Sequence, residues 1–169
     1  MQNLVIILIL VISIITDLRD RKILNIVTLP SIIAAFIYHF FTSGVEGFLY
    51  SGQGFLAGLG MLIIPFLMGG IGAGDVKLLA AIGAWNGTFF IFYTSIYAGI
   101  IGGLIALLIL LKRRELVFTL KRMLFSVAFI KSAKGYLVIK DDVHGSFSIP
   151  YAIPIALGAL LTFLMETFQ

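Results

Sequence analysis

The chain has 169 residues, of which 60% are hydrophobic and only 12% charged, and its formal net charge is +4. Soluble domains are roughly 45–50% apolar and about 25% charged, so this composition predicts a membrane protein. The absence of cysteine from the sequence excludes disulfides and thiolate catalysis. The basic residues cluster between apolar runs, which positive-inside topology explains, so we expect no nucleic-acid partner.

The apolar runs predict an all-α, polytopic transmembrane helix bundle of about six spans, forming one membrane-embedded domain over residues 1–169. No basic residue precedes the first run, so we expect it to stay as a helix rather than to be removed as a signal peptide. The predicted spans are residues 3–16, 26–41, 54–69, 76–86, 88–111 and 147–168.

The links between these runs predict the orientation. The link after the first span holds three basic residues, whereas residues 42–53 hold none. Residues 112–146 begin with a basic triplet and continue with apolar residues at helical spacing, which predicts a cytoplasmic amphipathic segment. Every basic residue then faces the cytoplasm, and both termini lie outside. The chain is expected in the cytoplasmic (inner) membrane.

Smaller features complete the helix prediction. Gly54, Gly58 and Gly60 would let a neighbouring helix pack closely. The pair Asn86-Gly87 is a strong turn signal, which ends the fourth span. Trp85 near that end fits an interfacial aromatic belt better than a binding site.

Two of the eight acids stand out, because Asp17 ends the first predicted span and Asp75 begins the fourth, both at the cytoplasmic boundary. Two carboxylates a few ångströms apart share a proton, since both cannot ionise cheaply. Such a pair supplies a base that activates water and an acid that polarises an amide carbonyl, with no metal or other cofactor required. The structural alternative makes Asp17 a solvated flanking residue and Asp75 a helix N-cap.

Residues 72–78, Gly-Ala-Gly-Asp-Val-Lys-Leu, reproduce the Gly-x-Gly-Asp signature of the type 4 prepilin peptidases, and the chain resembles that family of membrane aspartic proteases. Residues 17–25, from Asp17 to Asn25, fit the family's first aspartate motif, although Leu24 replaces its usual proline. Residues 149–158, with Pro150 and Tyr151, resemble the start of the family's last helix.

The resemblance implies catalytic roles for Asp17 and Asp75 and motif or substrate-binding roles for Gly72, Gly74, Lys77, Asn25 and Pro150. On residue chemistry alone, Lys77 is better explained as a topology anchor, and the two glycines equally well as a flexible helix start or as room for a substrate strand.

The resemblance also implies a substrate, the short basic leader of a prepilin-like membrane precursor, cut at the cytoplasmic face. The chain lacks the N-terminal four-cysteine extension of longer bacterial members, so it is similar to the short, cleavage-only form, which includes peptidases of tight-adherence pili and archaeal preflagellin peptidases. Methyltransferase activity is therefore not assigned. The sequence leaves the oligomeric state open.

Three other functions remain open at this point. A small ion-coupled transporter would place its acids near the bilayer midplane and break helices in both halves. A non-catalytic membrane subunit of a secretion system would tolerate loss of both aspartates. Another Gly-x-Gly-Asp protease would usually carry Tyr-Asp at its first acid, where this chain has Thr16 and Asp17.

Overall fold

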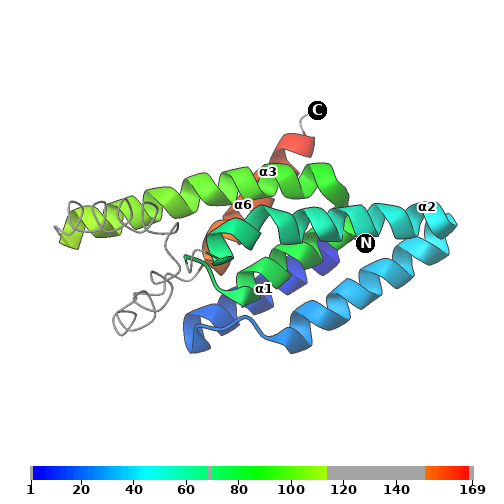
Figure 1. Cartoon of the computed structure of the whole chain (residues 1–169), viewed down its shortest axis with the longest axis horizontal. Helices are drawn as coiled ribbons and strands as arrows, with labels where there is room; N and C mark the ends of the chain where they lie inside the picture. The colour runs from blue at the N-terminus through cyan, green and yellow to red at the C-terminus, as the bar shows by residue number, and fades with distance from the viewer. Residues whose placement is uncertain (1, 68–69, 114–150, 168–169) are drawn as a thin grey trace, which may run out of the picture. The chain divides into compact units, whose positions relative to one another are not determined.

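The computed structural model describes residues 2–67, 70–113 and 151–167, and within these ranges every regular element is a helix. The helices are α1 (Gln2–Asp20), α2 (Asn25–Leu67), α3 (Ala73–Arg113) and α6 (Ala152–Thr167), as Figure 1 shows. The all-α prediction is therefore confirmed for the described residues.

The chain divides into two compact units. The first comprises residues 1–102 and 150–169, and the second comprises residues 103–149. Of the second unit, the structure describes residues 103–113, which form the end of α3. The buried core lies in the first unit.

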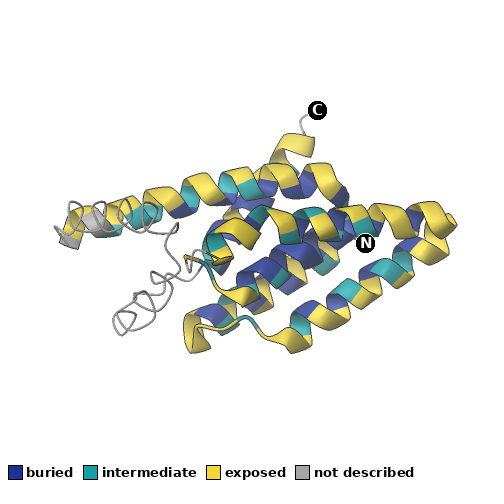
Figure 2. Ribbon diagram, in the orientation of Figure 1, coloured by how far each residue is buried: buried dark blue, intermediate teal, exposed yellow. Residues whose placement is uncertain are grey.

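Three of the helices, α1, α2 and α3, are long and apolar enough to cross a bilayer. α6 is also apolar, but its 16 residues rise only about 24 Å, less than the roughly 30 Å of the hydrocarbon core. Each helix shows exposed positions beside buried ones in Figure 2. Many exposed positions carry leucine, isoleucine or phenylalanine, which suits a lipid environment.

The prediction of six separate spanning helices is not supported, because the structure has four helices in its described part and three candidate spans. The predicted link at residues 42–53 is helical, with non-helical backbone angles only at Gly44. The predicted break after Asn86 is also a single non-helical residue, Gly87, inside α3. The apolar runs therefore overestimated the length of the first break, whereas the turn signal located the second at its single residue.

Glycine makes these short breaks possible. Gly44 has φ 61° and ψ −138°, and Gly87 has φ 79° and ψ −176°. Residues with a Cβ rarely adopt such angles, whereas glycine adopts them readily. The ribbon of α2 doubles back within its length in Figure 1, so one residue is enough to reverse the chain.

The helix end at Gly87 exposes backbone carbonyls that need donors, because the last turn of a helix leaves its C=O groups without intrahelical partners. Three side chains of α2 bond to three consecutive carbonyl oxygens of α3 at 2.7–3.0 Å. These pairs are Ser51 with Ala84, His39 with Trp85, and Tyr50 with Asn86. We call these three side chains the Gly87-end cluster.

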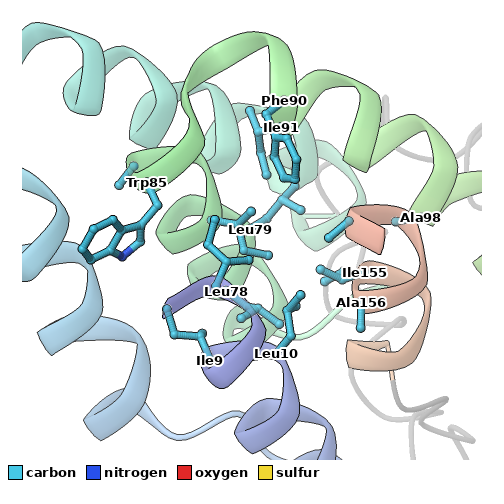
Figure 3. Packing of buried hydrophobic residues seen from close by; sticks show 14 of the residues in the cluster. Ile9, Leu10, Leu78, Leu79, Trp85, Phe90, Ile91, Ala98, Ile155 and Ala156 are labelled. Atoms are coloured by element: carbon cyan, nitrogen blue, oxygen red, sulfur yellow. The ribbon is translucent and has the colours of Figure 1, made fainter. Parts of the chain in front are cut away.

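The start of α3 is the centre of the core. Residues 78–82 have no exposed surface at all, so this part of α3 is covered on every side. Figure 3 shows Leu78 and Leu79 among apolar side chains of α1 and α6. α1 packs against both α2 and α6. The burial of this segment fixes the position of Asp75, which lies one turn before it.

Close helix contacts complete the packing. A Cβ added at Gly54 of α2 would collide with the carbonyl oxygen of Gly83 in α3, and one at Gly58 would lie 2.6 Å from that of Leu79. Both glycines therefore serve the close packing predicted for them, whereas a Cβ at Gly60 would meet open space. Trp85 is 5% exposed and donates from Nε1 to Ser31 Oγ, so the prediction of an interfacial belt position was wrong for this residue.

Two predictions fall on residues outside the described ranges. The cytoplasmic segment 112–146 is described only at Lys112 and Arg113, which continue α3. Pro150 and the beginning of the predicted last span lie outside the described residues as well.

Candidate active site

Asp17 lies in the last turn of α1 and is only 7% exposed, which is unusual for a carboxylate. Its Oδ2 atom accepts a hydrogen bond of 3.1 Å from the backbone N–H of Ala152, the first residue of α6. The backbone N–H of Arg21, in the left-handed region at φ 52°, bonds to the Asp17 carbonyl and ends the helix. Asp17 is therefore a buried residue held by a distant helix, and not a solvated flanking residue.

Asp75 lies in the first turn of α3 and is 8% exposed. Its Oδ2 atom accepts a 3.1 Å hydrogen bond from the Gly72 N–H, and its own N–H donates to the Gly72 carbonyl at 3.2 Å. The first bond is one half of a capping box with Gly72 as N-cap; glycine has no side chain to supply the other half. Asp75 is the third residue of the helix and not its N-cap. It still caps the helix start, as the structural alternative expected, but from within the first turn. The capping bond occupies one carboxylate oxygen.

The structure brings the two carboxylates into one site. The charge of Asp17 acts directly on Asp75, and the charge of Asp75 acts on the hydroxyl of Tyr151. Ala152, which holds Asp17, directly follows Tyr151 in the chain. The ends of α1, α3 and α6 therefore meet at a single buried cluster that contains both acids.

The predicted support residues flank this cluster. Gly74 packs against the α1–α2 connection, where an added Cβ would lie 2.9 Å from the Cβ of Ile23. Two residues further along α3, Lys77 Nζ donates a 2.9 Å hydrogen bond to Asn25 Oδ1 at the start of α2. Lys77 and Asn25 thus tie α3 to the segment that follows Asp17. Pro150 lies outside the described residues, so no contact is assigned to it.

Sequence reasoning missed Tyr151. Burial raises the pKa of its hydroxyl above the ordinary value of 10.0, and the negative charge of Asp75 raises it further. The phenol keeps its proton at neutral pH and is available as a hydrogen-bond donor. The available signal was the Pro-Tyr pair at the start of the last apolar run, in which only the proline was selected.

The arrangement supplies two neighbouring carboxylates, a phenol hydroxyl and a backbone N–H in a setting shielded from water. These groups suit proton transfer to and from a reacting amide. Among the described residues there is no cluster of three or more histidine, aspartate or glutamate side chains that could hold a metal ion.

Comparison with known proteins identifies the chain's relatives. Residues 4–107 match the model of the type IV leader peptidase family, and this range contains both Asp17 and Asp75. No curated protein and no solved structure matches the chain. The match covers more than half of the sequence and includes both buried acids. The chain belongs to the type IV leader peptidase family.

Proposed function

We propose that the protein is an aspartic endopeptidase that uses Asp17 and Asp75 to remove the short basic leader of type IV prepilin-like precursors. One observation carries the proposal. Two buried carboxylates, Asp17 and Asp75, lie 58 positions apart in the sequence, and the charge of Asp17 acts on Asp75. Burying two acids together is costly, and membership of a peptidase family supplies the reason for it.

The chemistry follows from the pair sharing one proton. The ionised carboxylate takes a proton from a water molecule, whose oxygen bonds to the amide carbon while the carbonyl electron pair moves onto the carbonyl oxygen. The protonated carboxylate gives its proton to that oxygen. In the second step the nitrogen receives a proton from the pair as the C–N bond breaks, and the other carboxylate takes a proton back from one of the two hydroxyls on the amide carbon. A carboxylic acid and an amine leave, and the pair again shares one proton.

The charge pattern supports a cytoplasmic site. Arg19, Arg21 and Lys22 follow Asp17 within five residues, and Lys77 follows Asp75 within two. Basic residues next to membrane helices favour the cytoplasmic side, where the basic leader of a precursor would remain for the same reason. We therefore place the site at the cytoplasmic face of the inner membrane, with the termini outside, and take the lipid bilayer and the precursor as its partners.

The test uses membranes from cells that express each variant, incubated with a pilin-like precursor. Asp17→Asn and Asp75→Asn should each reduce the cleavage rate by about 10³-fold or more, because no second group replaces the lost acid or base. Both proteins should still accumulate in membranes, because asparagine retains an oxygen that accepts the backbone N–H.

Asp20→Asn is the matched control, because Asp20 is an exposed acid three residues from Asp17 on the same helix. It should cleave at the wild-type rate. The product mass reports the cut site and any added methyl group in the same measurement. Leader removal by the Asp17→Asn or Asp75→Asn protein at the wild-type rate would refute the assignment of that residue.

A further inference from the structure

Backbone hydrogen bonds hold Tyr151 and Ala152 beside the acid pair. The Ala152 N–H donates to Asp17 Oδ2 at 3.1 Å, and the Tyr151 carbonyl accepts from the Ile155 N–H at 3.2 Å. The first bond attaches this segment to α1, and the second makes Tyr151 continuous with the first turn of α6. The Tyr151 backbone therefore cannot move away from the pair without breaking a bond to a catalytic carboxylate.

The Tyr151 side chain is fixed as well. It lies against Gly102 of α3, where an added Cβ would lie 2.9 Å from Tyr151 Cε2 and 3.2 Å from its hydroxyl oxygen. A side chain at position 102 would require the ring to move from this position. Gly102 thus leaves a space on α3 in which the phenol ring packs.

The hydroxyl group of Tyr151 is free to act on a substrate. Within the described ranges, no atom forms a hydrogen bond with it. The acids that face this part of α6 are Asp75 from α3, whose charge acts on the hydroxyl, and Asp17 from α1, which binds the adjacent N–H. Because its pKa is raised, the phenol keeps its proton beside these negative charges.

We propose that Tyr151 is a third catalytic residue, whose hydroxyl donates a hydrogen bond to the carbonyl oxygen of the scissile amide. The proposal rests on the peptidase function proposed above. Negative charge develops on that oxygen as water attacks, and a fixed donor stabilises it more in the transition state than in the bound substrate. The Tyr151 hydroxyl keeps its proton throughout, so the proton transfers remain those of the carboxylate pair.

A purely structural role makes a different prediction. If Tyr151 only packs against Gly102, phenylalanine should replace it without loss, because the ring is retained. If the hydroxyl contacts the reacting carbonyl, Tyr151→Phe should lower kcat on the order of 100-fold and leave KM nearly unchanged, the size of effect seen when one oxyanion donor is removed.

The experiment measures kcat and KM for leader removal in membranes by the wild type, Tyr151→Phe and Tyr93→Phe. Tyr93 is the matched control, because it is a half-exposed tyrosine of α3. The Tyr93→Phe protein should cleave at the wild-type rate. Tyr151→Phe activity within twofold of the wild type overturns the proposal. No cleavage by the wild type overturns the peptidase function itself, and the proposal with it.

A second variant separates catalysis from folding. Ring-fluorinated tyrosine at position 151 keeps the ring and the hydroxyl but lowers the pKa of the phenol. The proposal expects the alkaline decline of kcat to move to lower pH, because the deprotonated phenol no longer donates and repels the charge that develops on the carbonyl oxygen. An unchanged pH profile in this variant, together with normal membrane accumulation, overturns the proposal.

Discussion

Two polar clusters of the first unit each contain a buried titratable side chain but differ in what their groups do. His39, in the Gly87-end cluster, is 6% exposed, and Asp17, in the acid cluster, is 7% exposed. His39 bonds to a carbonyl oxygen that a helix end leaves without a partner, and Ser51 and Tyr50 do the same. Their hydrogen bonds complete the backbone pairing of the fold.

The acid cluster is different because its side chains have more hydrogen-bonding capacity than the fold uses. Asp17 and Asp75 each accept one backbone N–H through Oδ2, which leaves each carboxylate with further acceptor capacity. The charge of Asp17 acts on Asp75, and the Tyr151 hydroxyl, on which the charge of Asp75 acts, has no described partner. Burial of a titratable residue therefore does not by itself indicate function in this chain. Hydrogen-bonding capacity that the fold leaves unused is the better indicator.

The largest effect is expected from loss of the hydrogen bond that the Ala152 N–H donates to Asp17. If cleavage did not need this bond, the contrast between the two clusters would fail. Ala152→Pro removes this N–H at the first position of α6, where proline is well tolerated in helices. A hydrogen bond to a charged group contributes about 1.5–3 kcal/mol, so kcat for leader removal should fall roughly 10- to 100-fold. Ala152→Ser keeps the N–H and serves as control. An equal loss in both variants would show that packing, and not the donor, matters here.

The opposite result is expected at the Gly87-end cluster. His39→Ala and Ser51→Ala each leave a buried carbonyl oxygen without its donor, which costs about 1–3 kcal/mol. Thermal unfolding in detergent should therefore begin at a lower temperature. The cleavage rate per folded molecule should stay within about twofold of the wild type, because neither side chain contacts the acids. A large fall in kcat at unchanged stability would contradict the structural role.

The smallest expected effect concerns the hydrogen bond between Lys77 and Asn25, which is exposed to solvent. Lys77→Met and Asn25→Ala should each lower stability slightly, and a double-mutant cycle should give a coupling of about 0.5–1 kcal/mol. The measurement is the free energy of unfolding of the two single variants and the double variant. A coupling near zero would leave Lys77 with the role predicted from its charge alone, that of a topology anchor.

The sequence was most informative where a residue type has one physical explanation. An acid is costly at a membrane boundary, and this cost alone singles out Asp17 and Asp75 in the sequence. In the structure both are buried, and the charge of Asp17 acts on Asp75. Turn chemistry located the break at Gly87 for the same kind of reason. Their catalytic roles remain predictions until the variants are measured.

The sequence was least informative where tertiary contacts decide the role. Lys77 carries a charge that fits positive-inside topology, and only the fold reveals its partner Asn25, 52 positions earlier in the chain. Trp85 is of a residue type that is common at membrane interfaces, yet Ser31 provides a buried acceptor for its N–H. Apolar runs likewise cannot show whether a break between helices takes twelve residues or one, as at Gly44.

The hydrogen bond from Ala152 to Asp17 joins residues 135 positions apart. During synthesis, both acids leave the ribosome well before Ala152 does, and they also lie within the family match at residues 4–107. A nascent chain at that stage contains both carboxylates. It does not yet contain the Ala152 N–H that binds Asp17, or Tyr151 beside Asp75. The N–H that holds Asp17 and the tyrosine beside Asp75 therefore join the acid pair only after residue 152 has been added to the chain.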